Sequence, residues 1–205
     1  MELPSNSIIL IAGVPGSGKS TISYELLNTY DEIRIIEETD IIREILLGYN
    51  EYLLKSERTK YENIYTNDVL MTYDMAASQC EIMKHSLLQI IKRQQRKGIP
   101  TIINGVHIVP EILCPFLSYN DLLYITLYLE SEAGLRARLE TRNQKKYTRE
   151  SVPLLYEANK ALAEKASQLS IKYPNVIPFN TETLSIDETV SDLKGLIDDF
   201  YCINT

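Results

Sequence analysis

Cysteine, glycine and proline are all scarce in this chain, and each shortage excludes a class of protein. The three cysteines, Cys80, Cys114 and Cys202, lie far apart and are odd in number, and no CxxC pair occurs. The sequence therefore indicates neither a zinc site nor a disulfide framework, and free thiols suit a reducing cytosol. Eight glycines and eight prolines are too few for a fibrous or disordered chain.

Long apolar runs and excess positive charge are also missing. No run approaches the roughly 18 apolar residues that a membrane span needs. The short apolar stretch at residues 8–12 follows acidic Glu2, whereas a signal peptide has a basic start and a longer apolar core. The net charge of −7 opposes general nucleic-acid binding, although a local basic site remains possible. We expect a cytoplasmic protein that contacts neither membrane nor nucleic acid.

The 205 residues suffice for one α/β domain with a sizeable core. Short β-branched or apolar runs, typical of buried parallel strands, alternate with segments of helical spacing, which favours a parallel sheet with helices on both faces. We therefore predict a single three-layer domain over 1–205, with an acceptor-binding insert near 48–80 and a lid near 134–150. The expected strands are 7–12, 33–38, 101–103, 122–129 and 176–179, and the expected helices are 20–30, 40–47, 76–97, 132–143, 151–169 and 185–200.

Two of these helices carry start signals. Ser151 precedes Pro153 and an apolar stripe, so we expect Ser151 to cap its helix. Ser185 and Glu188 have the spacing of a capping box, in which each side chain bonds the other residue's backbone N–H.

The strongest motif follows the first expected strand. Residues 13–20 read Gly-Val-Pro-Gly-Ser-Gly-Lys-Ser and match the phosphate-binding pattern GxxxxGK[ST] in full. Glycines let backbone N–H groups turn toward phosphate oxygens, and the helix that follows adds its positive end. We expect Lys19 to reach the β- and γ-phosphates and Ser20 to bind Mg²⁺. The expected nucleotide-binding residues are Gly13, Pro15, Gly16, Ser17, Gly18, Lys19, Ser20 and Thr21.

This loop differs from the GxGxxG loop of nicotinamide-binding domains. By itself it does not separate a kinase from a GTPase, a motor or an ATP switch. No guanine-binding N/TKxD sequence is apparent, which favours ATP over GTP. We expect contacts to the base near residues 180–184, directly after the last strand.

The second strand ends at an acid that suits phosphoryl transfer. The carboxyl ends of parallel strands converge on the ligand crevice, so Asp40 is expected near the γ-phosphate, where it can accept the proton of an attacking hydroxyl. Arg43 lies one helical turn later and can hold an anionic acceptor. Alternatively, Asp40 caps the helix that follows it, and both roles are compatible.

His107 and a basic segment complete the candidate site. His107 follows a Gly turn at the end of the third strand, where contact with substrate or phosphate and a structural role are both open. Arg138 and Arg142 share one helix face in a segment rich in cations, and guanidinium groups there can close over the transferring phosphate. A solvated basic face is the alternative.

Together these pieces resemble the kinase domain of the 2-phosphoglycerate kinases over residues 8–200. The similarity is carried by the phosphate loop, by Thr-Asp-Ile-Ile-Arg-Glu at 39–44, by Gln79, by Gly-Val-His-Ile-Val-Pro at 105–110, and by Arg136, Arg138 and Arg142. The resemblance implies a nucleoside-monophosphate-kinase-like fold with strand order 2-3-1-4-5. It also implies transfer of phosphate from Mg²⁺-ATP to 2-phosphoglycerate or a similar small acid. Gln79 and Arg136 would then help to hold the substrate, with Asp40 beside the metal.

The sequence departs from this family in three places. Asn104 stands where the family has Glu before Gly-Val-His, so Asp40 would have to supply the negative charge near the metal. Residues 48–75 match poorly, and we expect no N-terminal regulatory module. Asp40 and Arg43 also resemble the acceptor motif of polynucleotide kinases and zeta-toxin-like kinases, and Asn104 leaves a non-catalytic nucleotide switch as a further alternative.

Overall fold

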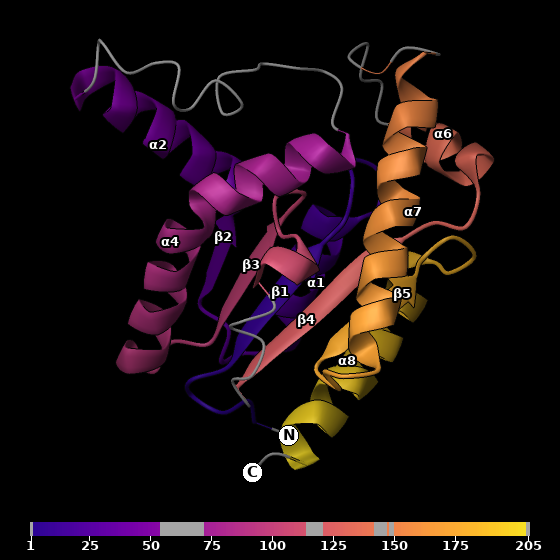
Figure 1. Ribbon diagram of the computed structural model, residues 1–205. Coiled ribbons are helices and arrows are strands. Elements are labelled where there is room, and N and C mark those ends of the chain that lie inside the picture. The colour runs from indigo at the N-terminus through magenta and orange to yellow at the C-terminus, as the bar shows by residue number, and fades with distance from the viewer. Residues whose placement is uncertain (1, 54–71, 114–120, 142–146, 148–149, 204–205) are drawn as a thin grey trace.

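The computed structural model describes residues 2–53, 72–113, 121–141, 147 and 150–203. Strands and helices alternate along these residues (Figure 1). The strands are β1 (Ile8–Ala12), β2 (Ile35–Glu38), β3 (Thr101–Gly105), β4 (Leu122–Tyr128) and β5 (Val176–Asn180). The helices are α1 (Lys19–Thr29), α2 (Thr39–Leu53), α4 (Tyr73–Lys97), α5 (Pro110–Leu113), α6 (Glu132–Thr141), α7 (Ser151–Ser170) and α8 (Ile186–Ile203).

The strands form one parallel sheet in the order β2-β3-β1-β4-β5. This confirms both the five-stranded parallel sheet and the strand order that the family resemblance implied. Because the strands are parallel, their carboxyl ends lie along one edge of the sheet. The loop after β1 therefore has the ends of β2 and β3 on one side and the ends of β4 and β5 on the other.

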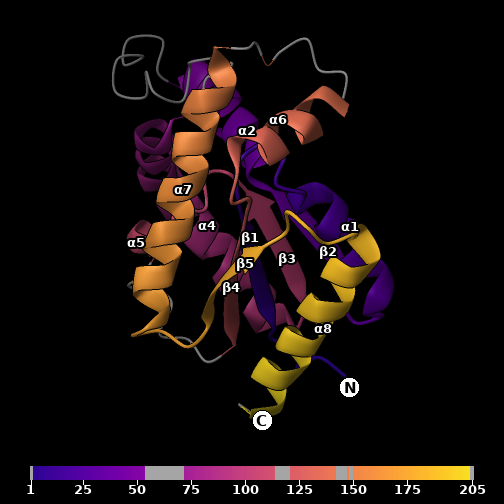
Figure 2. The ribbon, with the colours of Figure 1, turned by 90° about the vertical axis from the view of Figure 1, so that its right-hand side faces the viewer.

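Helices bury both faces of the sheet. Along β1, Ile8, Leu10 and Ala12 belong to one apolar cluster with residues of α4, α5 and α7. Ile9 and Ile11 belong to a second cluster with residues of α1 and α8. Figure 2 shows α7 and α8 on opposite sides of the sheet. Side chains of a strand alternate between faces, so a strand covered on both sides needs the continuous apolar run seen in the sequence.

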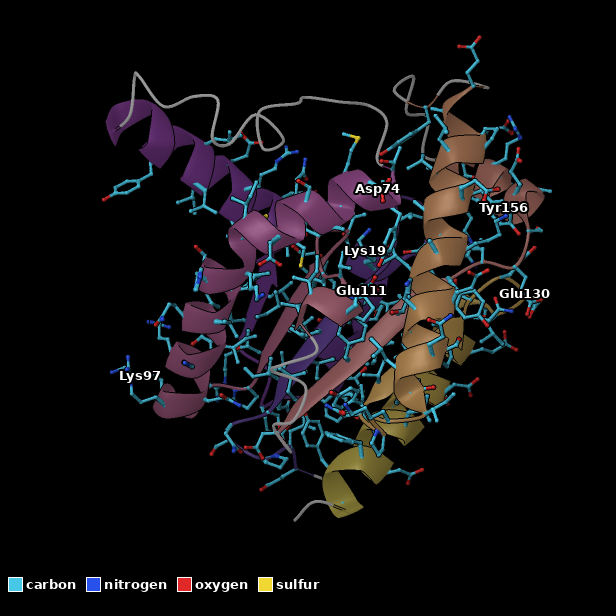
Figure 3. All side chains as sticks on the ribbon, in the orientation of Figure 1. Lys19, Asp74, Lys97, Glu111, Glu130 and Tyr156 are labelled. Atoms are coloured by element: carbon cyan, nitrogen blue, oxygen red, sulfur yellow. The ribbon has the colours of Figure 1, made fainter. Side chains whose placement is uncertain are left out.

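Helix α4 has clear signals at both ends. The side chain of Thr72 accepts a hydrogen bond from the Met75 backbone N–H at 3.2 Å, and Gly98 ends the helix with a φ of 63°. Asp74 lies in the first turn and Lys97 in the last, where each charge interacts favourably with the helix dipole. The two residues mark opposite ends of the helix in Figure 3. This ending at Gly98 is the one expected from the sequence.

Some boundaries differ from the sequence-based expectations. Helix α2 begins at Thr39 and continues to Leu53, past Gly48, whose helix propensity is poor. Of the expected insert, the first residues belong to α2 and the last to α4, while 54–71 lie outside the described residues. Ser151 is the first residue of α7 and not its cap, because Glu150 occupies the cap position without a side-chain bond. Within the described residues, no helix is both long enough and apolar enough to cross a bilayer.

Candidate active site

The loop between β1 and α1 needs its glycines. Gly13 and Gly18 have φ angles of 150° and 99°, a region that side chains with a Cβ atom rarely adopt. A Cβ atom on Gly13 would lie 2.4 Å from the Ser17 Oγ atom and 2.6 Å from the Leu127 carbonyl oxygen. The backbone therefore turns tightly between the sheet and α1.

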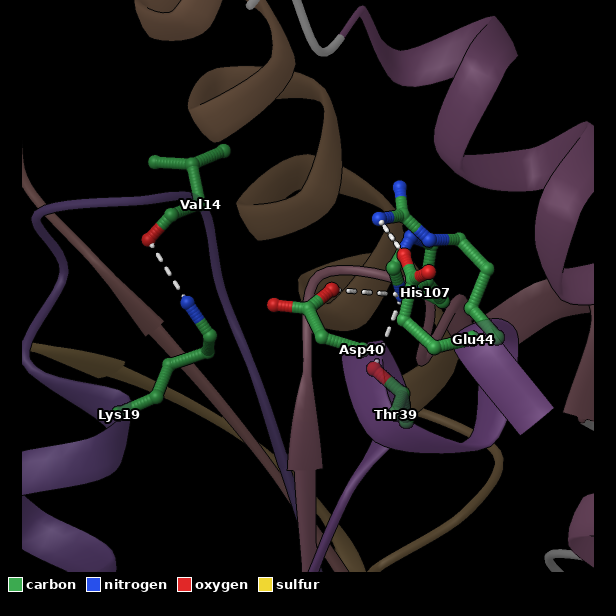
Figure 4. A network of polar contacts seen from close by, with 7 residues as sticks. Val14, Lys19, Thr39, Asp40, Glu44 and His107 are labelled. Atoms are coloured by element: carbon green, nitrogen blue, oxygen red, sulfur yellow. Dashed lines mark hydrogen bonds and ion pairs between the residues drawn. The ribbon is translucent and has the colours of Figure 1, made fainter. Parts of the chain in front are cut away.

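Helix α1 starts directly from this loop. Gly18 occupies the cap position without a side-chain hydrogen bond, so the first backbone N–H groups of α1 remain available to a ligand. The Lys19 ammonium donates a hydrogen bond to the Val14 carbonyl at 3.1 Å, across the loop (Figure 4). Ser20 and Thr21 occupy the next positions of the first turn. These features form a cradle for an anion, which is what phosphate groups require.

Asp40 lies on the β2 side of the loop. It belongs to the first turn of α2, which begins at Thr39, so Asp40 is a first-turn residue and not the helix cap. Its side chain is 69% exposed, and its Oδ1 atom lies 3.6 Å from Nδ1 of His107. In Figure 4 the other carboxylate oxygen faces Lys19. The carboxylate thus stands between the lysine of the phosphate loop and a buried imidazole.

His107 lies behind Asp40 and is completely buried. Its Nδ1 atom is 2.9 Å from the Oγ1 atom of Thr39, which is also buried. Burial lowers the pKa of the imidazole to about 4, against the opposing effect of the Asp40 charge; the charges of Arg43 and Lys19 lower it further. The ring is therefore neutral near physiological pH, and its predicted contact with substrate would have to pass through Asp40 or follow a rearrangement.

Three other predicted substrate residues lie on separate helices. Arg43 on α2 is ion-paired with its neighbour Glu44, with 2.7 Å between Nη2 and Oε1. Gln79 on α4 is 1% exposed. Arg136 on α6 is paired with Glu132 at 2.6 Å, one helical turn earlier. The charge of Arg43 acts on His107. The substrate roles of Arg43, Gln79 and Arg136 stay predictions, and Arg142 lies outside the described residues.

Asn104 links the sheet to the helix of the phosphate loop. Its side-chain amide donates a hydrogen bond to the Ser23 hydroxyl on α1 at 3.1 Å, and both residues are buried. A neutral amide thus occupies the position where the family resemblance implied an acid. The register of the sheet places Glu38 of β2 directly beside Asn104, so an acid follows on the neighbouring strand.

A pocket of about 380 Å³ lies on the β4–β5 side of the phosphate loop. Its walls come from residues 16–18 of the loop, from α1, from α6, and from the first turn of α8 with the segment before it. Apolar surface comes from Leu184 and Ile186, near the position expected for base contacts. This pocket is large enough for part of a nucleoside, and it opens beside the phosphate loop.

Arg138 belongs to this pocket. Its Nη1 atom donates to the Thr181 hydroxyl at 2.9 Å and to the Ser17 carbonyl at 3.4 Å, and its Nη2 atom donates to the Thr181 carbonyl. Burial lowers the pKa of the guanidinium, although the Glu182 charge opposes this effect. The sequence predicted Arg138 at the transferring phosphate; the structure places it beside Ser17 of the loop and Thr181, which follows β5. Its catalytic role stays a prediction.

Sequence reasoning placed Thr39 in the family motif and Thr181 in the range expected for base contacts, but it gave neither residue a role of its own. Each is a buried threonine at the carboxyl end of a strand, next to a residue that the sequence did single out. Their position at the carboxyl ends of strands could be predicted from the sequence, because Thr39 directly precedes Asp40 and Thr181 follows the last strand. Their hydrogen bonds to His107 and Arg138 depend on contacts between segments far apart in the chain.

The residues present fit a magnesium-bound nucleoside triphosphate. The loop has glycines at Gly13 and Gly16, where a Cβ atom would collide with neighbouring residues, and it has a lysine and a helix start beside it. Mg²⁺ usually takes one or two protein ligands and completes its shell with phosphates and water. Among the described residues, no three His, Cys, Asp or Glu side chains gather into a metal site of their own. Ser20 and Asp40 suit this sparse ligand set.

The sequence is similar to several proteins that share one name, 2-phosphoglycerate kinase. The chain is 29% identical over 211 residues to the 2-phosphoglycerate kinase of Methanococcus maripaludis, covering 93% of this chain and 64% of that protein. It is 30% identical over 148 residues to the enzyme of the same name from Methanopyrus kandleri, covering 67% of this chain and 44% of that one. This chain resembles the 2-phosphoglycerate kinases. The chain spans less than two thirds of the length of these relatives, and no protein-family model matches it.

Solved structures place the fold among the P-loop kinases. A gluconokinase from Sinorhizobium meliloti superposes with a TM-score of 0.54 at 14% identity, covering 100% of both chains. A deoxyadenosine kinase from M. mycoides has a TM-score of 0.52 at 17% identity, covering 94% of this chain and 99% of its own. A shikimate kinase from Acinetobacter baumannii has a TM-score of 0.51 at 15% identity, covering 96% and 94%. These similarities concern the fold, which is that of P-loop kinases.

Proposed function

We propose that this chain is an ATP-dependent phosphotransferase that phosphorylates the hydroxyl of a small anionic metabolite, 2-phosphoglycerate or a similar acid. One observation carries the proposal: the strand order separates two half-sites around the phosphate loop. The pocket lined by Arg138 and Thr181 lies toward β4 and β5, while Asp40, Arg43 and His107 follow β2 and β3. A nucleoside on one side and an acceptor on the other would meet at Lys19.

The proposed reaction transfers the γ-phosphoryl group of ATP to the acceptor hydroxyl. The acceptor oxygen forms a bond to the γ-phosphorus, the bond from that phosphorus to the bridging oxygen breaks, and ADP leaves with the electron pair. The hydroxyl proton passes to the Asp40 carboxylate, which stands at the carboxyl end of β2 and is open to solvent. Lys19 would hold the β- and γ-phosphates and stabilise the charge that develops there. Mg²⁺, held by Ser20 with Asp40 nearby, would neutralise phosphate charge.

The proposed acceptor is anionic because of Arg43. Its guanidinium is close enough for its charge to act on His107, and it is paired with Glu44, so a carboxylate or phosphate of the acceptor would compete with Glu44 for it. The Glu44 side chain is 57% exposed, so it can turn into solvent when an acceptor anion takes its place. The similarity to the 2-phosphoglycerate kinases makes their named substrate the first candidate.

An acceptor screen with labelled ATP tests the proposal. The panel should contain 2-phosphoglycerate, 3-phosphoglycerate, glycerate, shikimate, gluconate, a nucleotide sugar and an oligonucleotide with a free 5′ hydroxyl. Transfer to a small acid is the expected result. Transfer to the nucleotide sugar or the 5′ end would favour the zeta-toxin-like or polynucleotide-type alternative, and the proposal would then be wrong about the acceptor.

Asn104 favours one further candidate, a nucleotide-binding switch that transfers no phosphate. A buried amide bonded to Ser23 offers no negative charge at this position. Calorimetry with Mg²⁺-ATP followed by the same screen separates the two functions. Tight binding of ATP without transfer to any acceptor, and without slow hydrolysis, would favour the switch.

A further inference from the structure

The two ring nitrogens of His107, the buried imidazole behind Asp40, have different hydrogen-bonding surroundings. Its Nδ1 atom faces the Thr39 hydroxyl at 2.9 Å and the Asp40 carboxylate at 3.6 Å. Its Nε2 atom is buried and has no hydrogen-bond partner among the described residues. One of the two nitrogens carries the proton in the neutral ring, and the two choices are not equivalent.

A proton on Nδ1 is the better choice. An Nδ1–H can donate to Thr39 Oγ1 and points toward the negative carboxylate, whereas a bare Nδ1 would direct its lone pair at that carboxylate. The orphaned Nε2 is then an acceptor, and a buried acceptor without a partner is less unusual than a buried N–H without one. Both arguments select the same tautomer.

The position of Thr39 is itself enforced by the backbone. A Cβ atom on Gly105, at the end of β3, would lie 1.7 Å from Thr39 Oγ1 and 2.8 Å from Thr39 Cβ. Glycine at this position therefore lets the threonine hydroxyl approach β3 closely enough to meet the ring of His107. The anchor is built from β3, the segment after it, and the first residue of α2.

We propose that His107 is a positioning residue for Asp40: its Nδ1–H donates to Thr39 Oγ1, turns the positive side of the ring dipole toward Oδ1 of the carboxylate, and leaves the second oxygen for the acceptor. The inference rests on the proposed function, in which Asp40 receives the acceptor proton. The separation of 3.6 Å is longer than a hydrogen bond, so the ring acts on the carboxylate through electrostatic attraction. Figure 4 shows the second oxygen turned toward Lys19, on the side where the phosphate would lie.

Two substitutions of His107 separate positioning from packing. Asn carries its amide nitrogen at the level of Nδ1, and Gln carries it one bond further out, near the level of Nε2. We expect His107→Gln to lower kcat about 10- to 100-fold with little change in KM for ATP, and His107→Asn to retain most of the activity. Equal losses in both variants would overturn the inference. If His107→Gln does not fold, Thr39→Val removes the anchoring hydroxyl at nearly constant shape and should lower kcat in the same way.

A double-mutant cycle tests whether His107 acts through Asp40. In an Asp40→Asn background the carboxylate is already gone, so His107→Gln should cause no further loss of kcat. A full additional loss would show that His107 acts independently of Asp40, and the inference would be wrong.

A measurement without any acceptor keeps this inference distinct from the proposed function. The ¹⁵N chemical shifts of the His107 ring report directly which nitrogen carries the proton. We expect Nδ1–H in the wild-type chain, and Nε2–H would overturn the inference whatever the kinetics. A chain that transfers phosphate to no acceptor would instead contradict the proposed function, while the tautomer would still decide the geometry claimed here.

Discussion

Arg138 of α6 donates a hydrogen bond from Nη1 to the hydroxyl of Thr181, 43 residues away and 2.9 Å distant. The same guanidinium reaches the Ser17 carbonyl in the phosphate loop, so it joins α6, the segment after β5 and the loop that should hold phosphate. We expect Arg138→Ala to weaken ATP binding about tenfold, or about 1.4 kcal/mol, without changing KM for the acceptor. Arg138→Lys should recover little, because a lysine cannot form the planar two-nitrogen contact.

Arg136→Ala is the matched control for this prediction. It removes a guanidinium from the same helix, but one paired with Glu132. Calorimetric titration of each variant with Mg²⁺-ATP gives the comparison. A loss of ATP affinity in Arg136→Ala as large as that in Arg138→Ala would mean that charge on α6, and not the contact with Thr181, sets the affinity.

Asp40→Asn tests the assignment of the base. The Asp40 side chain is 69% exposed, and its contact with His107, at 3.6 Å, is longer than a hydrogen bond. The substitution should therefore leave the fold intact. We expect ATP binding to remain largely intact and kcat to fall at least about a hundredfold, because the neutral amide of Asn cannot accept the proton of the attacking hydroxyl. Single-turnover transfer with labelled ATP measures this loss. Unchanged turnover would end the assignment of Asp40 as the base.

The fold and the phosphate loop were predictable from sequence because their signals are local. Residues 13–20 specify a loop by glycine content and spacing alone, and β1 shows its burial on both faces by an unbroken apolar run. The capping box of Ser185 and Glu188 was predicted correctly, since both residues lie within one turn. Such patterns need no knowledge of distant contacts.

The arrangement of the site was less predictable because it depends on contacts across the fold. Arg138 and Thr181 meet only through the packing of α6 against the segment after β5. His107 appears in the sequence as a polar residue at a strand end, where exposure is common, yet it is completely buried and its Nδ1 atom meets the Thr39 hydroxyl. Ser151 has the residue type of a cap but is the first residue of its helix. The helix begins one residue earlier than the sequence pattern indicates, and such boundaries are commonly uncertain by one or two residues.

Gly105→Ala should disturb the acceptor half-site without touching any charged residue. The added Cβ atom would collide with Thr39, so Thr39 must move and lose its position against His107. We expect a fall in kcat with ATP affinity unchanged, and a lower free energy of unfolding. Gly195→Ala is the control, because nothing lies within 4 Å of its added Cβ atom and it lies within α8. That variant should be neutral or more stable by up to about 1 kcal/mol.

The comparison needs both kinetics and urea unfolding for the two alanine variants. A combined Gly105→Ala, Thr39→Gly variant should relieve the collision and recover stability while kcat stays low, because the anchoring hydroxyl is absent. Full activity in Gly105→Ala alone would contradict the claim that the close approach of Thr39 matters to the site.

Glu188 should make the stability of α8 sensitive to acid. Its carboxylate accepts hydrogen bonds from the Ser185 backbone N–H at 2.9 Å and from the Ser185 hydroxyl at 2.8 Å, and these bonds lower the pKa of Glu188. A carboxyl whose pKa is lower in the folded state stabilises the fold above its unfolded pKa, and this stabilisation disappears as pH falls through the folded pKa. The difference in unfolding free energy between wild type and Glu188→Ala should therefore be larger at about pH 7 than at about pH 3.

Glu188→Gln retains an oxygen acceptor without the charge and should remove most of this pH dependence, whereas Asp187→Asn, in the same turn, should leave it in place. Urea unfolding of the four proteins at both pH values makes the comparison, and an equal difference at both values would mean that the charge of Glu188 does not contribute to the cap.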